Sequence, residues 1–175
     1  TLEAYFQGKK ELFEGLAMEK LEKDWKEYPI LHFDLNISQY DSPDSLYKIL
    51  NDILSRYEDE YGTRPSEVTL PLRFAGIDRA YRKTGQRAVI LIDEYDKPLL
   101  QNLHDEEMQN RLRNMLKPFY GVLKTMDRAI RFALLTGVTK FGKISVFSDL
   151  NNLMDLSMDN RYVEICGITE KEIHA

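Results

Sequence analysis

The sequence predicts an α/β protein in which a parallel β-sheet lies between layers of helices. Residues 88–92, AVILI, form an unbroken apolar run without the alternation of a half-exposed strand. A run of this kind is typical of a central parallel strand that is covered on both faces. Other apolar runs alternate along the chain with helical stripes, which is the order expected of parallel βαβ units.

At the start of the chain, residues 1–8 are predicted to be the end of a helix that stops at Gly8. A charged surface stretch follows, up to Lys26. Residues 29–35, PILHFDL, follow a charged segment, begin with proline and are β-like in composition. We interpret this run as a second buried strand of the sheet.

A long helix is predicted between this strand and the run at 88–92. Ser42 and Pro43 open it, because a serine N-cap followed by proline in the first turn is a common helix start, and Gly62 ends it. Its apolar residues recur at spacings of three and four, which gives a face for core packing. A second helix is predicted at about 71–83.

Beyond the central strand, helix and strand signals continue to alternate. Residues 104–126 carry a helical apolar face, and Pro118 is expected to kink or split that helix. Residues 130–135, IRFALL, are predicted as a third strand and residues 161–166 as a weaker fourth one. A capping-box pattern opens a last helix at 169–175.

The bulk composition indicates one domain, residues 1–175, with a core at about 28–167. The chain has 175 residues, of which 43% are hydrophobic, enough to form a core. Its net charge is −5 and it contains no basic block, so the composition does not indicate nucleic-acid binding. A single cysteine, Cys166, excludes an internal disulfide, and no signal peptide or membrane span is apparent. We therefore expect a cytoplasmic protein.

Polar residues follow two of the predicted strands at the point where each ends. Asp93 and Glu94 come directly after 88–92, and Thr136 follows 130–135. Ligands of parallel sheets bind at the carboxyl ends of the strands, so these side chains are expected to share one cleft. In phosphate-handling enzymes such an aspartate holds Mg²⁺, the neighbouring acid polarises the attacking water, and a hydroxyl can contact the γ-phosphate. These three residues could instead be polar turn residues with only a structural role, and this alternative stays open.

The segment after Thr136 is rich in polar residues. Lys140 and Lys143 are placed near the same edge, where either could neutralise phosphate charge or simply be solvated. The pattern GxxxxGK[ST], which cradles phosphates, occurs nowhere in these residues. Histidines show no zinc-ligand spacing, and no serine lies in a G-x-S-x-G elbow.

Five segments are distributed along nearly the whole chain: FQGKKELFEGL (6–16), YPILHFDL (28–35), AVILIDEYDKPLL (88–100), LLTGVTKFGKISVFSDLNNLMDLS (134–157) and YVEICGITEKEI (162–173). Together they resemble one known family, the bacterial AAA-ATPase-like proteins. These proteins are P-loop ATPases, often followed by a PD-(D/E)XK nuclease-like domain. The resemblance implies a three-layer P-loop NTPase-like sheet and the use of ATP and Mg²⁺.

The resemblance also implies roles for individual residues. Asp93 matches the Walker B aspartate that holds Mg²⁺, Glu94 the adjacent catalytic acid, and Thr136 the polar residue that closes the next strand. Lys140, chosen for its charge and its position after Thr136 and not from the resemblance, is the candidate for further nucleotide contact. In the family, an RRFGKS-type P-loop lies shortly before the segment that starts here at Thr1. This part of the protein is therefore expected to be inactive alone and to show a gap where the P-loop strand would lie.

Two further functions stay open from the sequence. One is a non-catalytic interaction module that keeps the scaffold without the phosphate cradle and binds a partner protein or a second copy. The other is a receiver domain, which needs an acidic pair on its first strand, whereas 29–35 offers only Asp34. A GKS or GKT sequence shortly upstream of Thr1 would favour the ATPase.

Overall fold

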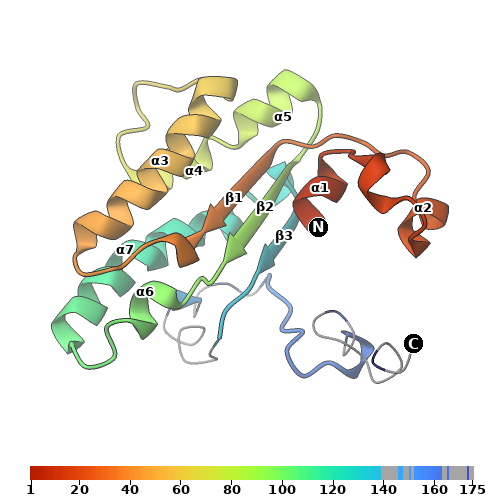
Figure 1. Cartoon of the computed structure of the whole chain (residues 1–175). Helices are drawn as coiled ribbons and strands as arrows, with labels where there is room; N and C mark the ends of the chain where they lie inside the picture. Colours follow the sequence, from red (N-terminus) through yellow and green to blue (C-terminus); the bar gives the residue numbers. More distant parts are fainter. Residues whose placement is uncertain (139–145, 148–149, 151, 163–164, 166–172, 174–175) are drawn as a thin grey trace.

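The computed structural model describes residues 1–138, 146–147, 150, 152–162, 165 and 173. Within them, three parallel strands form one sheet in the order β1-β2-β3: β1 (Ile30–Asp34), β2 (Ala88–Asp93) and β3 (Ile130–Leu135) (Figure 1). Each strand coincides closely with a predicted run. Neighbouring strands are hydrogen bonded directly, so the gap expected within the sheet is wrong for these three strands.

Helices cover the sheet on both sides and give three layers. One face carries α3 (Pro43–Tyr61), α4 (Leu70–Ala75), α5 (Asp78–Thr84) and α7 (Glu106–Thr125), and the other carries the short α1 (Leu2–Phe6) (Figure 1). The remaining short elements are α2 (Ala17–Leu21), α6 (Lys97–Leu100) and the 3₁₀ turns Lys10–Phe13, Leu35–Ile37, Asp127–Ala129 and Asn160–Tyr162. The predicted α/β layered class is confirmed.

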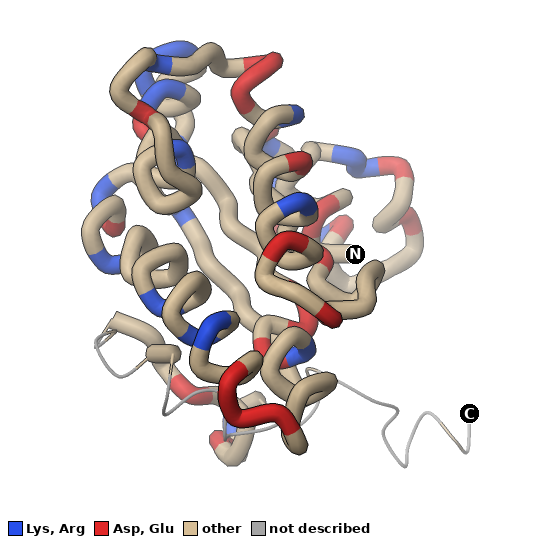
Figure 2. The backbone as a smooth tube through the Cα atoms, turned by 90° about the vertical axis from the view of Figure 1, so that its left-hand side faces the viewer, with Lys and Arg blue, Asp and Glu red and all other residues tan. Residues whose placement is uncertain are grey.

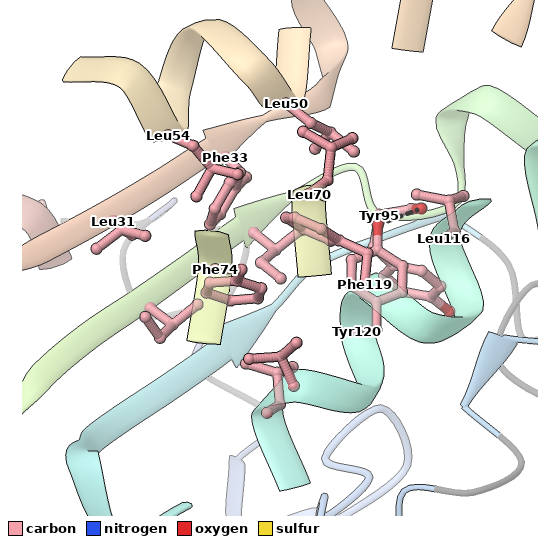
Figure 3. Close-up of a cluster of buried hydrophobic side chains, with 14 of the residues drawn as sticks. Leu31, Phe33, Leu50, Leu54, Leu70, Phe74, Tyr95, Leu116, Phe119 and Tyr120 are labelled. Atoms are coloured by element: carbon pink, nitrogen blue, oxygen red, sulfur yellow. Dashed lines mark hydrogen bonds between the residues drawn. The ribbon is translucent and has the colours of Figure 1, made fainter. Parts of the chain in front are cut away.

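The main core lies between the sheet and the α3, α4 and α7 layer. Phe33 of β1 is fully buried there, with its ring centroid 5.2 Å from that of Phe74 and 5.3 Å from that of Phe119 (Figure 3). The rings of Phe74 and Phe119 stack at 4.7 Å. Aromatic contacts at these separations stabilise a core beyond the burial of their area alone. These three residues join β1, α4 and α7.

Residues on the opposite face of the strands form a smaller cluster. Val89 and Leu91 of β2 are buried against Phe6 of α1, and the Phe6 ring lies 5.3 Å from that of Phe132 on β3. Successive side chains of a strand point to opposite faces, so the apolar run of β2 supplies both clusters. The two-sided burial predicted for this strand is confirmed.

The structure corrects the helix predicted at 71–83. It is two helices, α4 and α5, because the chain turns at Gly76. A Cβ atom at Gly76 would lie 2.2 Å from Nη1 of Arg79, so a side chain there would require the guanidinium to shift from its place over the backbone. Arg79 is held in this place by a buried ion pair with Glu67.

Two other predictions change near the end of the chain. Pro118 does not split its helix, since α7 runs unbroken from Glu106 to Thr125 with Pro118 on the exposed side. The first residues of the predicted fourth strand form a 3₁₀ turn, because the backbone N–H of Tyr162 bonds back to the Asp159 carbonyl at 2.9 Å. Most of that strand and of the helix predicted at 169–175 lies outside the described residues.

Charged residues are spread over the surface of the described chain. Figure 2 shows basic and acidic segments on helices and loops alike, while the strands carry few of either sign. In the described part of the chain, no helix combines the length and apolar character needed to cross a membrane.

Candidate functional site

The carboxyl ends of the three strands form one row of polar residues. Asp34 at the end of β1 is opposite Asp93 at the end of β2 in the sheet register. Thr136 directly follows Leu135, which is paired with Ile92. By alternation along the strands, Asp34, Asp93 and Thr136 all fall on the face that α1 covers. The sheet therefore aligns two carboxylates and a hydroxyl across its carboxyl edge.

Three of the predicted site residues are in direct contact. The Thr136 hydroxyl donates a hydrogen bond to the carboxylate of Asp93. The backbone N–H of Glu94 lies 3.4 Å from the same hydroxyl oxygen, in a long hydrogen bond. The Thr136 backbone is fixed on both sides, because its N–H donates to the Ile92 carbonyl and its carbonyl accepts from the Tyr95 N–H, each at 2.9 Å.

Glu94 has an unusual backbone conformation. Its φ angle is +56°, in the left-handed region that residues with a side chain seldom occupy. Such a conformation costs on the order of 1–3 kcal/mol and persists only where the surrounding structure imposes it. Here β2 ends at Asp93, and the Glu94 carbonyl accepts the N–H of Lys97 at 2.9 Å, closing a tight turn. Strain of this kind clusters at functional sites.

The loop after β1 is tied to the same turn. The Asp34 carboxylate accepts the backbone N–H of Asn36 at 2.9 Å, and the Lys97 ammonium donates to the Asn36 side-chain oxygen at 3.0 Å. The backbone N–H of Tyr40 donates to the side chain of Gln101 at 2.8 Å. Side chains from the segment after β2 therefore hold the loop after β1. The carboxyl edge of the sheet is formed by both segments together.

Sequence reasoning gave no site role to two residues of this edge, Asp34 and Asp96. The sequence offers Asp34 only as one half of the acidic pair that a receiver domain needs. Its position beside Asp93 depends on the strand register, which a single sequence does not show. Asp96 is completely buried, and its carboxylate accepts the backbone N–H of Val138 at 3.2 Å. The available signal for Asp96 was its place in the motif DEYD, three residues after Asp93.

The donor atoms at this edge suit a magnesium ion. Asp93 and Thr136 are exposed and supply hard oxygen atoms. Among the described residues, no group of three or more His, Cys, Asp or Glu side chains is placed to hold a metal. A magnesium ion bound here would depend on one carboxylate together with water and phosphate oxygens, which is a common arrangement for this ion. Lys140 lies outside the described residues.

A cavity lies elsewhere, between α1, the loop before β1 and the start of β3. Its volume is about 230 Å³. It is lined by Tyr5, Phe6, Glu22, Asp24, Trp25, Lys26, Tyr28 and Arg131. The hydroxyl of Tyr5 donates to the Glu22 carboxylate at 2.5 Å, and this bond raises the pKa of Tyr5 to about 12 and lowers that of Glu22 to about 2. Of the predicted site residues, the three that the structure describes, Asp93, Glu94 and Thr136, do not border this cavity.

Comparisons with known proteins identify the family of this chain. The sequence model of a family described as "Predicted AAA-ATPase" matches residues 1–147. An "uncharacterized protein in vnfD 5'region" of Azotobacter chroococcum mcd 1 is 37% identical over 177 residues, which covers 100% of this chain and 34% of that protein. This chain thus spans about a third of the length of that relative. No solved structure matched the chain. The family match over most of the chain places this protein in the predicted AAA-ATPase family.

Proposed function

We propose that the full-length protein binds and hydrolyses ATP with Mg²⁺, and that the carboxyl edge of this sheet is the acidic half of its catalytic site. The observation that carries the proposal is the contact of Thr136 with Asp93 and Glu94 at the ends of two adjacent parallel strands. Ligands of parallel sheets bind at this edge. Membership of the predicted AAA-ATPase family supports the choice of nucleotide.

Each residue has a role that follows from its chemistry. The exposed carboxylate of Asp93 would hold Mg²⁺, and a bound Mg²⁺ neutralises charge on the β- and γ-phosphates. Glu94 would accept a hydrogen bond from the attacking water and polarise it. The Thr136 hydroxyl, which now donates to Asp93, would turn to a γ-phosphate oxygen. Lys140 would add positive charge beside the phosphates.

In this proposal the phosphate cradle would come from another part of the protein. The outer edge of β3 has no strand partner among the described residues, and Phe132 and Leu134 on it are partly exposed. A further parallel strand paired with this edge would bring its carboxyl end next to Thr136. The P-loop implied by the family resemblance would then lie beside Asp93, and the site would be complete in the longer chain.

The strand order argues against a receiver domain. In the flavodoxin-like order 2-1-3-4-5, the first strand lies between the second and third. Here β1 is an outer strand of the described sheet and β2 is central. The acidic residues Asp34 and Asp93 also lie on different strands, so the phosphoacceptor pair of a receiver is not formed on β1.

Glu94→Gln in the full-length protein is the direct test. We expect Mg²⁺-ATP binding, measured by calorimetry, to persist and steady-state hydrolysis to fall roughly 10²- to 10⁴-fold, the range contributed by a positioned acid or base. Glu14→Gln, at an exposed position outside the site, is the matched control and should behave as wild type.

The result also separates the two main alternatives. Hydrolysis by Glu94→Gln at the wild-type rate would falsify the assignment of the base. If the wild-type full-length protein does not bind Mg²⁺-ATP, the nucleotide proposal fails, and the domain is better explained as a non-catalytic module that binds a partner protein or a second copy.

A further inference from the structure

We infer that Asp96 is a positioning residue that fastens the loop after β3, so that Thr136 stays against Asp93 and Glu94. The part of this inference that concerns hydrolysis rests on the proposed function. The part that concerns the loop rests on the contacts of Asp96 alone.

The first residues after β3, residues 136–138, have little side-chain packing to hold them. Thr136, Gly137 and Val138 are all exposed, and the Val138 side chain is 71% exposed. Backbone hydrogen bonds therefore hold these three residues, and those of Thr136 to Ile92 and Tyr95 are two of them. Asp96 provides another, because its completely buried carboxylate accepts the Val138 N–H at 3.2 Å. Hydrogen bonds to a charged group contribute more than neutral ones, and a buried carboxylate needs such partners.

Gly137 allows the loop to approach this close. A Cβ atom at Gly137 would lie 2.5 Å from Cε1 of Tyr95 and 2.7 Å from Oδ1 of Asp96. Both distances are far below normal contact, and the nearest atoms belong to buried side chains that cannot easily move. Any larger residue would push the loop away from Asp96. The space between the two loops, rather than backbone conformation, requires glycine here.

The turn that contains Asp96 is itself anchored to the core. The Tyr120 hydroxyl of α7 donates to the Tyr95 carbonyl at 3.1 Å, and burial raises the pKa of Tyr120 well above its ordinary value, so this hydroxyl stays a donor. The Asp96 carbonyl accepts the N–H groups of Leu99 at 3.0 Å and Leu100 at 2.9 Å, which starts α6. A continuous set of contacts thus runs from α7 through Asp96 to the loop that carries Thr136.

The test compares three substitutions in the full-length protein with a matched control. Asp96→Ala removes the acceptor, Asp96→Asn keeps a side-chain oxygen, and Gly137→Ala pushes the loop away from the other side. Gly121→Ala is the control, because a Cβ atom there meets nothing within 4 Å. Two readouts are measured on folded protein: amide hydrogen exchange at Val138, with β2 as internal reference, and kcat and KM for Mg²⁺-ATP.

We expect Asp96→Ala and Gly137→Ala to accelerate exchange at Val138 by about 10-fold or more while β2 stays protected. The kcat should fall about 10- to 100-fold with KM little changed, since a small misplacement of a contact residue acts on the chemical step. Asp96→Asn should restore most of both, and Gly121→Ala should match wild type.

Unchanged exchange at Val138 in Asp96→Ala and Gly137→Ala would overturn the inference. So would faster exchange with a wild-type kcat. If Asp96→Ala does not fold, Gly137→Ala still decides, because it leaves the carboxylate in place. A wild-type protein without ATPase activity would refute the proposed function instead, and the exchange at Val138 would still report on the role of Asp96.

Discussion

The two faces of the sheet differ in how completely they are covered. On the main face, α3, α4 and α7 bury a large cluster around Phe33 and Phe119, whereas on the other face α1 contributes Phe6 to a much smaller one. Phe132 and Leu134 remain partly exposed on that second face. The main face therefore contributes most of the buried core, whereas the α1 face, to which the row of polar strand ends belongs, is less completely covered.

The largest effect should come from the main face. Phe119→Ala removes a completely buried ring that contacts Phe33, Phe74 and Tyr120. We expect the free energy of unfolding to fall by about 3–5 kcal/mol, as is usual for large cavities in cores. Urea denaturation followed by circular dichroism measures this loss. A loss below about 1 kcal/mol would contradict the central place given to this cluster.

A smaller loss is expected on the α1 face. Phe6→Ala removes a ring that is 8% exposed and packs on Val89, Leu91 and Phe132. Burial of one such side chain contributes about 1.5–3 kcal/mol, and fewer neighbours surround this one. The same urea titration should therefore place Phe6→Ala between wild type and Phe119→Ala. Equal losses for the two variants would remove the distinction between the faces.

The smallest expected effect depends on pH and concerns the contact between Tyr5 of α1 and Glu22. The hydrogen bond from Tyr5 to Glu22 raises the pKa of Tyr5 to about 12 from an ordinary value of 10. Because the folded-state pKa is raised, the stabilisation is complete below about pH 10 and is lost as the pH rises through 12. The pKa of Glu22 is lowered to about 2, so its part is present above the ordinary value of 4.5 and lost as the pH falls through 2.

Tyr5→Phe tests this pair. Its free energy of unfolding should be below that of wild type by a small constant amount between about pH 5 and 10, and the difference should shrink above pH 10. Thermal unfolding across this range gives the measurement. Tyr81→Phe, at a ring that is 46% exposed, is the control for loss of a hydroxyl. A difference that grows above pH 10 would show that the hydrogen bond does not stabilise the protonated tyrosine.

The elements with a strong local signal could be predicted from the sequence. Strands β1, β2 and β3 were predicted because each is an apolar run of strand length. The long helix α3 begins where Ser42 and Pro43 indicate, and the Ser42 hydroxyl accepts the N–H of Ser45. These features depend on neighbouring residues in the chain, which is the information that a single sequence contains.

Features that depend on distant residues were missed or changed. At the break between α4 and α5, Arg79 lies over Gly76 and pairs with Glu67, a contact that no local pattern reveals. The pairing of Asp34 with Asp93 needs the strand register. The hydrogen bond between Val138 and Asp96 joins two loops that are 42 residues apart in the chain, so local sequence does not reveal it. Proximity of Asp93 and Thr136 was expected only because parallel strands end at one edge.

At Glu94 the left-handed backbone conformation lowers the stability of the fold, whereas the side chain is the one proposed to act in hydrolysis. Glycine adopts this conformation freely, so Glu94→Gly would relieve part of the roughly 1–2 kcal/mol that it costs a residue with a side chain. The same change deletes the carboxylate proposed to polarise water. Selection for a more robust fold and selection for hydrolysis would therefore favour different residues at this position. We expect variants selected for folding alone to favour glycine at this position and to lose the proposed hydrolysis while the fold is kept.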